Sequence, residues 1–151
     1  MWNQLQTDAY EGMLAETITM KGYKGDRIHA YLSRPLGNGP YPGIILISHM
    51  PGWDELNREV ARRFTQHGYI TLCPNIYERF GHGLPGEVVA KIRETGGTPD
   101  DSVMGDCEGA LDYLTSLPYG NGKTGVIGMC SGGRHAFLAG CQVKGIDAVV
   151  D

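Results

Sequence analysis

Four short apolar runs with helical segments between them constrain the fold of this 151-residue chain more than any other feature. In chain order the runs are GIILIS, YITLCP, TGVIGM and IDAVV. The first is apolar without alternation, as in a central parallel strand that is covered on both faces. Strands that alternate with helices pair in parallel through crossover connections. The pattern therefore predicts an α/β fold with a mostly parallel sheet and helices on both faces.

Two segments with alternating polar and apolar residues come before these runs. They are ETITMKGY and IHAYLSRP, and the KGDR between them is typical of a turn. In the second segment one face carries Ile28, Ala30 and Leu32, and the other carries His29, Tyr31 and Ser33. We therefore predict an opening antiparallel hairpin whose second strand is half-buried.

Helical periodicity fills the gaps between the apolar runs. Apolar residues recur every four positions over 54–67, and Gly68 follows where a terminating glycine is expected. The stretch TPDD is typical of a helix start, with Thr98 as the cap. Further helices are predicted over 132–142 and, within a glycine-rich segment, over 87–94. The stretch YGNGK, before the third apolar run, is predicted to be a turn.

The composition argues against several classes of function. The formal net charge of −4 provides no basic surface for nucleic acid. No apolar run approaches the roughly 18 residues of a membrane-spanning helix. The N-terminal MWNQLQTDAYEGM lacks the basic start and apolar core of a signal peptide. We therefore expect a cytoplasmic protein with neither a membrane nor a nucleic acid as partner.

The four cysteines do not form a recognisable metal site. They stand at positions 73, 107, 130 and 141, with no C-x-x-C pair and no His at zinc-finger spacing. We therefore expect no metal and no cofactor. In a reducing compartment free thiols are expected rather than disulfides. Cys107 lies on the apolar face of the helix after TPDD and is predicted to be a small core residue.

The stretch GMCSGG, residues 128–133, joins an apolar run to a predicted helix. A strand, a sharp turn and a helix, with small residues around the turn, are the context of a nucleophile elbow. Cys130 is then the predicted nucleophile, and the positive end of the helix dipole favours its thiolate. The predicted oxyanion donors are the backbone N–H of Ser131 and a second N–H at about Met50. Alternatively, Cys130 is only a small residue packed in a tight turn.

Together with this turn, the wider sequence resembles the dienelactone hydrolase family of the α/β-hydrolase fold. The matching segments are ETITMKGYKGDRIHAYLSRP with YPGIILIS, NREVARRFTQHGYITLCPNIYERFG, and YGNGKTGVIGMCSGGRHAFLAG. The resemblance covers nearly the whole chain. It implies hydrolysis of a small ester or lactone through an acyl-enzyme on a Cys, with a His and an Asp completing the triad and no metal cofactor. By this resemblance, Cys130 is the nucleophile, and Ser131 and Met50 supply the oxyanion donors.

The resemblance also implies a substrate-binding role for Arg79, in IYERFG. This position is similar to that of an Arg with which the lactone hydrolase holds the substrate carboxylate. A guanidinium suits this task because it grips a carboxylate with two parallel hydrogen bonds. The substrate is therefore expected to be a small molecule, with a hint that it is anionic. The alternative is that Arg79 is a solvated loop residue.

Two positions depart from the family pattern. His49 stands where the family has a Glu that pairs with the resting Cys. An imidazole cannot do the work of that carboxylate, so His49 is a candidate for shaping the oxyanion loop or for contacting the substrate. It is a candidate base only if it reaches Cys130. Asn75 replaces the Asp of the family's P-D-L-Y stretch.

The third departure concerns the end of the sequence, at Asp151. In this fold the acid and the histidine of the triad follow the nucleophile on later strands. We therefore expect residues 1–151 to be a single α/β-hydrolase domain that is incomplete at its C-terminus. The rest of the fold, with the Asp and the His, would be a continuation or a separate or cleaved chain. Two alternatives stay open: a thioesterase or acyl transferase on the same fold, and a non-catalytic hydrolase fragment that acts through protein–protein contact.

Overall fold

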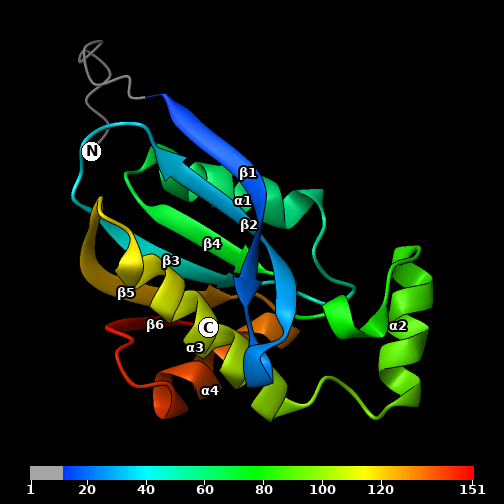
Figure 1. Ribbon diagram of the computed structural model, residues 1–151. Helices are drawn as coiled ribbons and strands as arrows, with labels where there is room; N and C mark the ends of the chain where they lie inside the picture. Colours follow the sequence, from blue (N-terminus) through cyan, green and yellow to red (C-terminus); the bar gives the residue numbers. More distant parts are fainter. Residues whose placement is uncertain (1–11) are drawn as a thin grey trace.

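The computed structural model describes residues 12–151, and its centre is one six-stranded sheet (Figure 1). The N-terminal residues that we compared with a signal peptide lie almost entirely outside this range. The order of the strands across the sheet is β1-β2-β4-β3-β5-β6. The strands are β1 Met13–Lys21, β2 Arg27–Pro35, β3 Tyr41–Ile47, β4 Ile70–Pro74, β5 Gly120–Gly128 and β6 Ala148–Val150.

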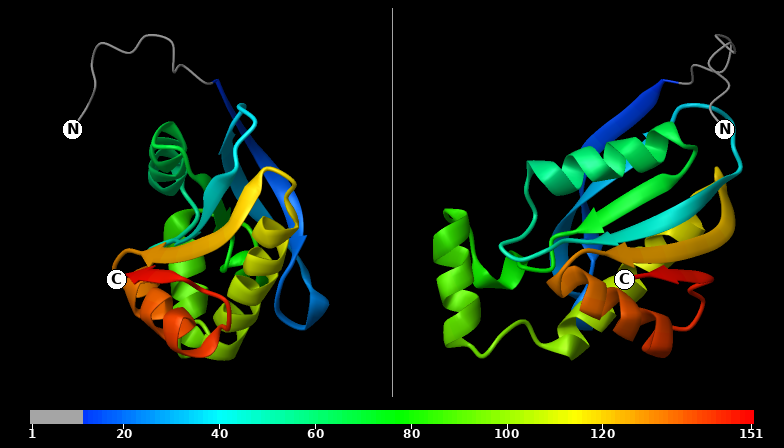
Figure 2. Two further views of the ribbon diagram at one scale, coloured as in Figure 1. Left: turned by 90° about the vertical axis from the view of Figure 1, so that its left-hand side faces the viewer. Right: turned by 180° about the vertical axis from the view of Figure 1, so that it is seen from behind.

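The helices lie on both faces of this sheet, as predicted. Figures 1 and 2 show α1 on one face and α3 with α4 on the other, while α2 lies beyond one end of the strands. Two short 3₁₀ turns, η1 and η2, lie in the loops after β1 and β4. The bounds are η1 Tyr23–Gly25, α1 Glu55–Gln66, η2 Glu78–Phe80, α2 Pro85–Glu94, α3 Asp100–Ser116 and α4 Ser131–Gln142. None of the described helices is long and apolar enough to cross a membrane.

The sheet is parallel from β4 to β6, and its other edge is antiparallel. Strand β3 pairs in parallel with β4 and β5, and β5 pairs in parallel with β6. The opening hairpin of β1 and β2 is antiparallel as predicted, and β2 also pairs antiparallel with β4. This mixed sheet with helices on both faces confirms the predicted fold class.

The prediction that β2 is half-buried is wrong. Tyr31 and Ser33, assigned to the polar face, are both buried. Since β2 lies between two strands and α1 packs over it, its second face is also covered. The Tyr31 hydroxyl accepts a hydrogen bond of 2.9 Å from Arg62 of α1, so this polar group is satisfied in its buried position.

Most helix boundaries agree with the sequence pattern within a few residues. The Asp54 carboxylate caps α1 by accepting the Asn57 N–H at 3.1 Å, and Gly68 follows the helix with a φ of +86°. Two details were wrong. The N-cap of α3 is Pro99 and not Thr98, and the expected turn YGNGK belongs to β5, which begins at Gly120.

Helix α3 crosses β1 at a backbone contact that only glycine allows. A Cβ atom on Gly109 would overlap the carbonyl oxygen of Lys21, at the end of β1. Residues of this helix on both sides of Gly109 are buried, including Cys107, which lies in the core as predicted. The contact therefore fixes how closely the helix layer lies against the hairpin.

We predict that Gly109→Ala destabilises the protein, although alanine is the better helix former by about 1 kcal/mol. The added methyl meets backbone and cannot be accommodated by a side-chain rotation. Gly86, in the first turn of α2, is the matched control, because a Cβ there would have no neighbour within 4 Å. Urea unfolding should show a loss for Gly109→Ala and little change or a gain for Gly86→Ala. Equal effects at both positions would contradict this packing.

Candidate active site

The turn between β5 and α4 holds its central residue in a strained conformation. Cys130 has φ +57° and ψ −120°, and it is the N-cap of α4. A positive φ is rare for a residue with a Cβ and is found where the surrounding structure imposes it, often at functional sites. The Cys130 thiol is exposed. A strained backbone with an exposed thiol at a strand-to-helix turn is the geometry of a nucleophile elbow.

Two glycines of GMCSGG, Gly128 and Gly132, are required by backbone contacts around this turn. A Cβ on Gly128 would overlap the Gly132 carbonyl group. A Cβ on Gly132 would collide with the backbone of Ile47 and would lie 2.8 Å from the carbonyl oxygen of Ser48. The N-terminus of α4 therefore lies directly against the end of β3, at a distance that side chains would prevent.

This approach brings the predicted oxyanion donors to one place. The backbone N–H of Met50, in the loop after β3, donates a 3.0 Å hydrogen bond to the Ser131 hydroxyl. Ser131 is the first residue of α4, so its own N–H belongs to the helix turn that has no intrahelical acceptor. Cys130, Ser131 and Met50 are thus neighbours, but the Met50 N–H is directed to a side chain that we had assigned no role.

A cleft of about 670 Å³ opens beside the elbow. Its walls combine the oxyanion loop, the start of α4 and the end of α2. Polar and charged groups on these walls belong to Tyr77, Arg93, Asp100, Ser131, Arg134 and His135. A cleft of this size accommodates a small organic molecule next to the thiol.

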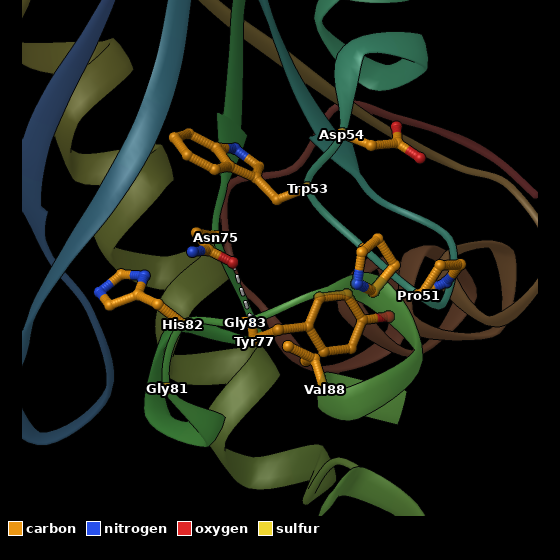
Figure 3. A pocket seen from close by; sticks show the side chains of 11 residues that line it. Pro51, Trp53, Asp54, Asn75, Tyr77, Gly81, His82, Gly83 and Val88 are labelled. Carbon is orange, nitrogen blue, oxygen red and sulfur yellow. Dashed lines mark hydrogen bonds between the residues drawn. The ribbon is translucent and has the colours of Figure 1, made fainter. Parts of the chain in front are cut away.

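Tyr77 is a cleft residue that sequence reasoning missed. It lies in the loop after β4 and is only 4% exposed. Burial raises the pKa of its phenol, while a hydrogen bond with the Ser131 side chain acts in the opposite direction. Gly52 makes room for it, because a Cβ there would lie 2.7 Å from the Tyr77 ring. Tyr77 and Val88 also share the wall of a second, smaller pocket of about 200 Å³ (Figure 3).

Asn75 organises the loop that carries Tyr77. Its side-chain oxygen accepts the Tyr77 N–H at 3.3 Å, drawn in Figure 3, and its amide donates to Glu78 at 2.8 Å. An Asp at position 75 could not donate to the Glu78 carboxylate and would repel it. The departure from the family's P-D-L-Y pattern is therefore matched by an acceptor three residues later.

The contacts of His49 lie within its own loop. Its Nε2 is 3.2 Å from the Asp54 carboxylate, and its Nδ1 is 3.2 Å from the Asn57 amide nitrogen. Both partners lie at the start of α1, and the Asn57 amide also donates to the Gly52 carbonyl oxygen at 2.9 Å. This arrangement ties the loop after β3 to the start of α1. No contact joins His49 to Cys130 among the described hydrogen bonds and ion pairs.

The guanidinium of Arg79, the residue expected to hold a substrate carboxylate, is bound by two carboxylates of the protein itself. It donates two hydrogen bonds of 2.9 Å to Asp106, whose carboxylate is fully buried, and one of 2.9 Å to Asp26. Asp106 also accepts the Tyr23 N–H at 2.8 Å. The hydrogen bonds to Asp106 raise the pKa of Arg79. Arg79 is therefore neither free for substrate nor solvated, because it joins the loop after β4 to α3 and η1.

An ionic group that lines the cleft is formed by α4 and the start of α3. Arg134 binds both oxygens of Asp100, at 2.6 and 2.7 Å, and this pairing lowers the pKa of Asp100. The His135 ring lies 3.4 Å from the same carboxylate and is 5% exposed. Burial, followed by the nearby Arg134 charge, lowers the pKa of His135.

The thiols fall into two classes. Burial raises the pKa of Cys73 and of Cys107 to about 12, whereas Cys130 and Cys141 are exposed. Cys141 lies near the opposite end of α4. Within residues 12–151, the side chains form no cluster of three or more His, Cys, Asp or Glu that could hold a metal ion.

We predict that replacing Arg79 lowers stability and leaves the Michaelis constant of an anionic ester almost unchanged. Arg79→Met leaves the buried Asp106 carboxylate without its main partner, which typically costs about 3–5 kcal/mol. The double variant with Asp106→Leu removes both charges and should recover part of this loss. Urea unfolding and steady-state kinetics would measure the two effects. A stable variant with a selectively raised Michaelis constant would restore the carboxylate-binding role.

We predict that His135 makes the folded state sensitive to acid. Because its folded pKa lies below the ordinary value of 6.5, the unfolded chain binds the proton more readily. The contribution of His135 to the free energy of unfolding is therefore fully present above about pH 6.5 and is lost as the pH falls through its folded pKa. Comparing the free energy of unfolding of the natural protein and His135→Gln at about pH 7.5 and 5.5 checks this. A loss on acidification that is as large in the variant would contradict it.

Comparison with known proteins places this geometry in a family. The model of the dienelactone hydrolase family matches residues 28–151. Carboxymethylenebutenolidase from Pseudomonas putida is 30% identical over 138 residues, covering 86% of this chain and 57% of the relative. The enzyme of the same name from Pseudomonas sp. strain P51 is 29% identical, with coverage of 83% and 55%.

Among solved structures, a candidate dienelactone hydrolase from Klebsiella pneumoniae superimposes with a TM-score of 0.80 at 25% identity. The match covers 91% of this chain and 58% of that structure. The dienelactone hydrolase-like phosphotriesterase P91, at 23% identity and a TM-score of 0.65, shares the fold. This chain therefore spans about half the length of the relatives that it matches. On the match to the family model, the chain belongs to the dienelactone hydrolase family.

Proposed function

We propose that this protein hydrolyses small carboxylic esters or lactones and that Cys130 is its nucleophile. The observation that carries the proposal is the strained backbone of Cys130, at φ +57°, on a turn where Gly128 and Gly132 admit no side chain. Such strain persists only where the structure enforces it, and here it presents an exposed thiol on the residue directly before Ser131, which lines a cleft. A merely structural cysteine would be expected among the buried ones, such as Cys73 and Cys107.

The proposed reaction proceeds through an acyl-enzyme. The Cys130 thiolate attacks the carbonyl carbon, and the oxyanion that forms is stabilised by donors at the start of α4 and in the loop after β3. Collapse of the tetrahedral adduct breaks the ester bond, and the departing oxygen takes the proton that the thiol lost. Water then hydrolyses the thioester and releases the acid, which regenerates the thiol.

A general base is needed in both steps, and we infer that it comes from outside residues 1–151. Of the described histidines near the cleft, His49 lies against Asp54, and the ring nitrogens of His135 are buried within the first turns of α4. The match with this chain covers 57% and 55% of two relatives, so a large part of each has no counterpart in residues 1–151. We therefore assign the triad His and Asp to a further segment or to a second chain, which would complete the single hydrolase domain.

The substrate that we propose is small and anionic. The matching relatives carry names that denote action on a lactone with a carboxymethylene group. Arg79 is engaged by Asp106 and Arg134 by Asp100, so we propose Arg93 of α2, which lines the cleft, as the cation that meets the anionic group. We propose the cytoplasm as the location, since a reducing compartment keeps an exposed catalytic thiol free.

We predict that Cys130→Ala lowers ester hydrolysis by about 10³-fold or more, the usual consequence of losing a nucleophile. Cys141→Ala, which removes the other exposed thiol of the same helix, is the matched control and should retain full activity. Hydrolysis of p-nitrophenyl acetate by the full-length protein measures both variants. Mass spectrometry should find the acyl group on the peptide that contains Cys130. Activity that survives Cys130→Ala would refute the proposal, and transfer of the acyl group to an added alcohol or thiol in preference to water would favour an acyl transferase.

A further inference from the structure

The hydroxyl of Ser131 occupies the position where an oxyanion donor was expected. The Met50 N–H, which the sequence pattern assigned to the oxyanion, is 3.0 Å from the Ser131 Oγ and donates to it. Both residues line the cleft beside the elbow. A substrate carbonyl oxygen that enters this cleft therefore meets the Ser131 side chain where the sequence pattern predicted a bare backbone amide.

The chemistry of a hydroxyl decides what Ser131 can offer there. A serine hydroxyl has two acceptor lone pairs and one hydrogen to donate. The Met50 N–H uses one lone pair. Tyr77 lines the same cleft, and because burial raises the pKa of its phenol, Tyr77 carries its proton at neutral pH. If the phenol donates to the second lone pair, the serine hydrogen is left for a third partner.

We propose that the Ser131 hydroxyl donates a hydrogen bond to the oxyanion formed on Cys130, and that the Met50 N–H acts through it. This inference rests on the proposed function of the same site. Ser131 then contributes two donors, its backbone N–H and its side-chain O–H, from the residue directly after the nucleophile. Tyr77 is a positioning residue, because it orients and polarises the hydroxyl without touching the substrate.

The surroundings keep this chain of donors in place. Tyr77 is held by the Asn75 side chain, which accepts its N–H at 3.3 Å, and by the absence of a side chain at Gly52. Ser131 is fixed by the contact between α4 and the end of β3 at Gly132. Hydrogen bonds in such a chain polarise one another, so the two donors into the Ser131 oxygen make its own hydrogen a stronger donor.

The test compares three variants of the full-length protein on p-nitrophenyl acetate. Ser131→Ala should lower kcat by about 10²- to 10³-fold, as the loss of one oxyanion donor does, with KM changed by less than about threefold. Ser131→Thr keeps a hydroxyl at the same position and should retain most of the activity. Tyr77→Phe should lower kcat by about three- to tenfold, which corresponds to one hydrogen bond lost indirectly.

Two reagents separate oxyanion stabilisation from an effect on the thiol or on the fold. A trifluoromethyl ketone adds reversibly to the Cys130 thiol and places an oxyanion in the same position, so its inhibition constant should rise for Ser131→Ala in parallel with the loss of kcat/KM. Iodoacetamide alkylates the thiol by displacing iodide and forms no oxyanion. The rate at which iodoacetamide alkylates Cys130 should therefore change by less than about twofold on Ser131→Ala. Both proteins carry Cys141→Ala, which removes the other exposed thiol of α4.

The possible failures are distinguishable. If Ser131→Ala keeps kcat within about threefold while Cys130→Ala is inactive, the hydroxyl is not a donor and the inference is overturned, but the proposed function stands. If alkylation by iodoacetamide slows as much as hydrolysis does, the hydroxyl acts on the thiol or on the fold, and the inference is again overturned. If Cys130→Ala remains active, the proposed function fails and the inference fails with it.

Discussion

The backbone contact between the start of α4 and the ends of β3 and β5 determines where every other part of the candidate site lies. Gly128 and Gly132 make this contact possible, because a Cβ on either would overlap backbone. In the turn between these two glycines, Cys130 has a positive φ. Its thiol is then presented outside the sheet, and the first turn of the helix lies next to the loop after β3. The nucleophile and its donors therefore follow from one packing constraint.

A second constraint holds the loop that supplies Tyr77. The Asp106 carboxylate is fully buried on α3, and three N–H donors from Arg79 and Tyr23 satisfy it. A buried charge is tolerated only when its hydrogen bonds are complete. Arg79 is two residues beyond Tyr77, so this ion pair sets the position of the phenol as well as that of the loop. Arg79, which resembled a substrate-binding arginine in the sequence, thus stabilises the loop that carries Tyr77 to the cleft.

The features that sequence could predict depend on local periodicity. The apolar runs, the α1 pattern and the glycines around Cys130 each occur within a few consecutive residues, and all were placed correctly on strands, helices and turns. The burial of Tyr31 was not predictable in this way, because it depends on Arg62 and on the pairing of β2 with β4. The partner of Arg79 lies 27 residues away on another helix, and no spacing rule connects them.

Tyr77 and the Ser131 hydroxyl were missed for a related reason. The elbow pattern assigns a role to the backbone N–H of the residue after the nucleophile, and it predicts nothing about the side chain of that residue. Met50, Tyr77 and Ser131 come from three separate segments that meet only in the folded chain, where the Met50 N–H donates to the hydroxyl and Tyr77 lines the same cleft. One signal was available: Asn75 in place of the family's Asp, followed by Glu78, marks a loop with its own hydrogen bonds.

The two constraints act on different parts of the proposed chemistry. An oxyanion donor must lie within a few tenths of an ångström of its place, because it gains its effect by not having to reorganise during the reaction. The contact at Gly132 provides such rigidity for Ser131, since backbone rests on backbone there. The cleft wall is held by side chains instead, through Arg79 with Asp106 and Arg134 with Asp100. Side-chain pairs can rearrange around substrates of different shape while the elbow stays fixed. The proposed oxyanion stabilisation therefore depends on backbone contacts, and the proposed choice of substrate on the side chains around the cleft.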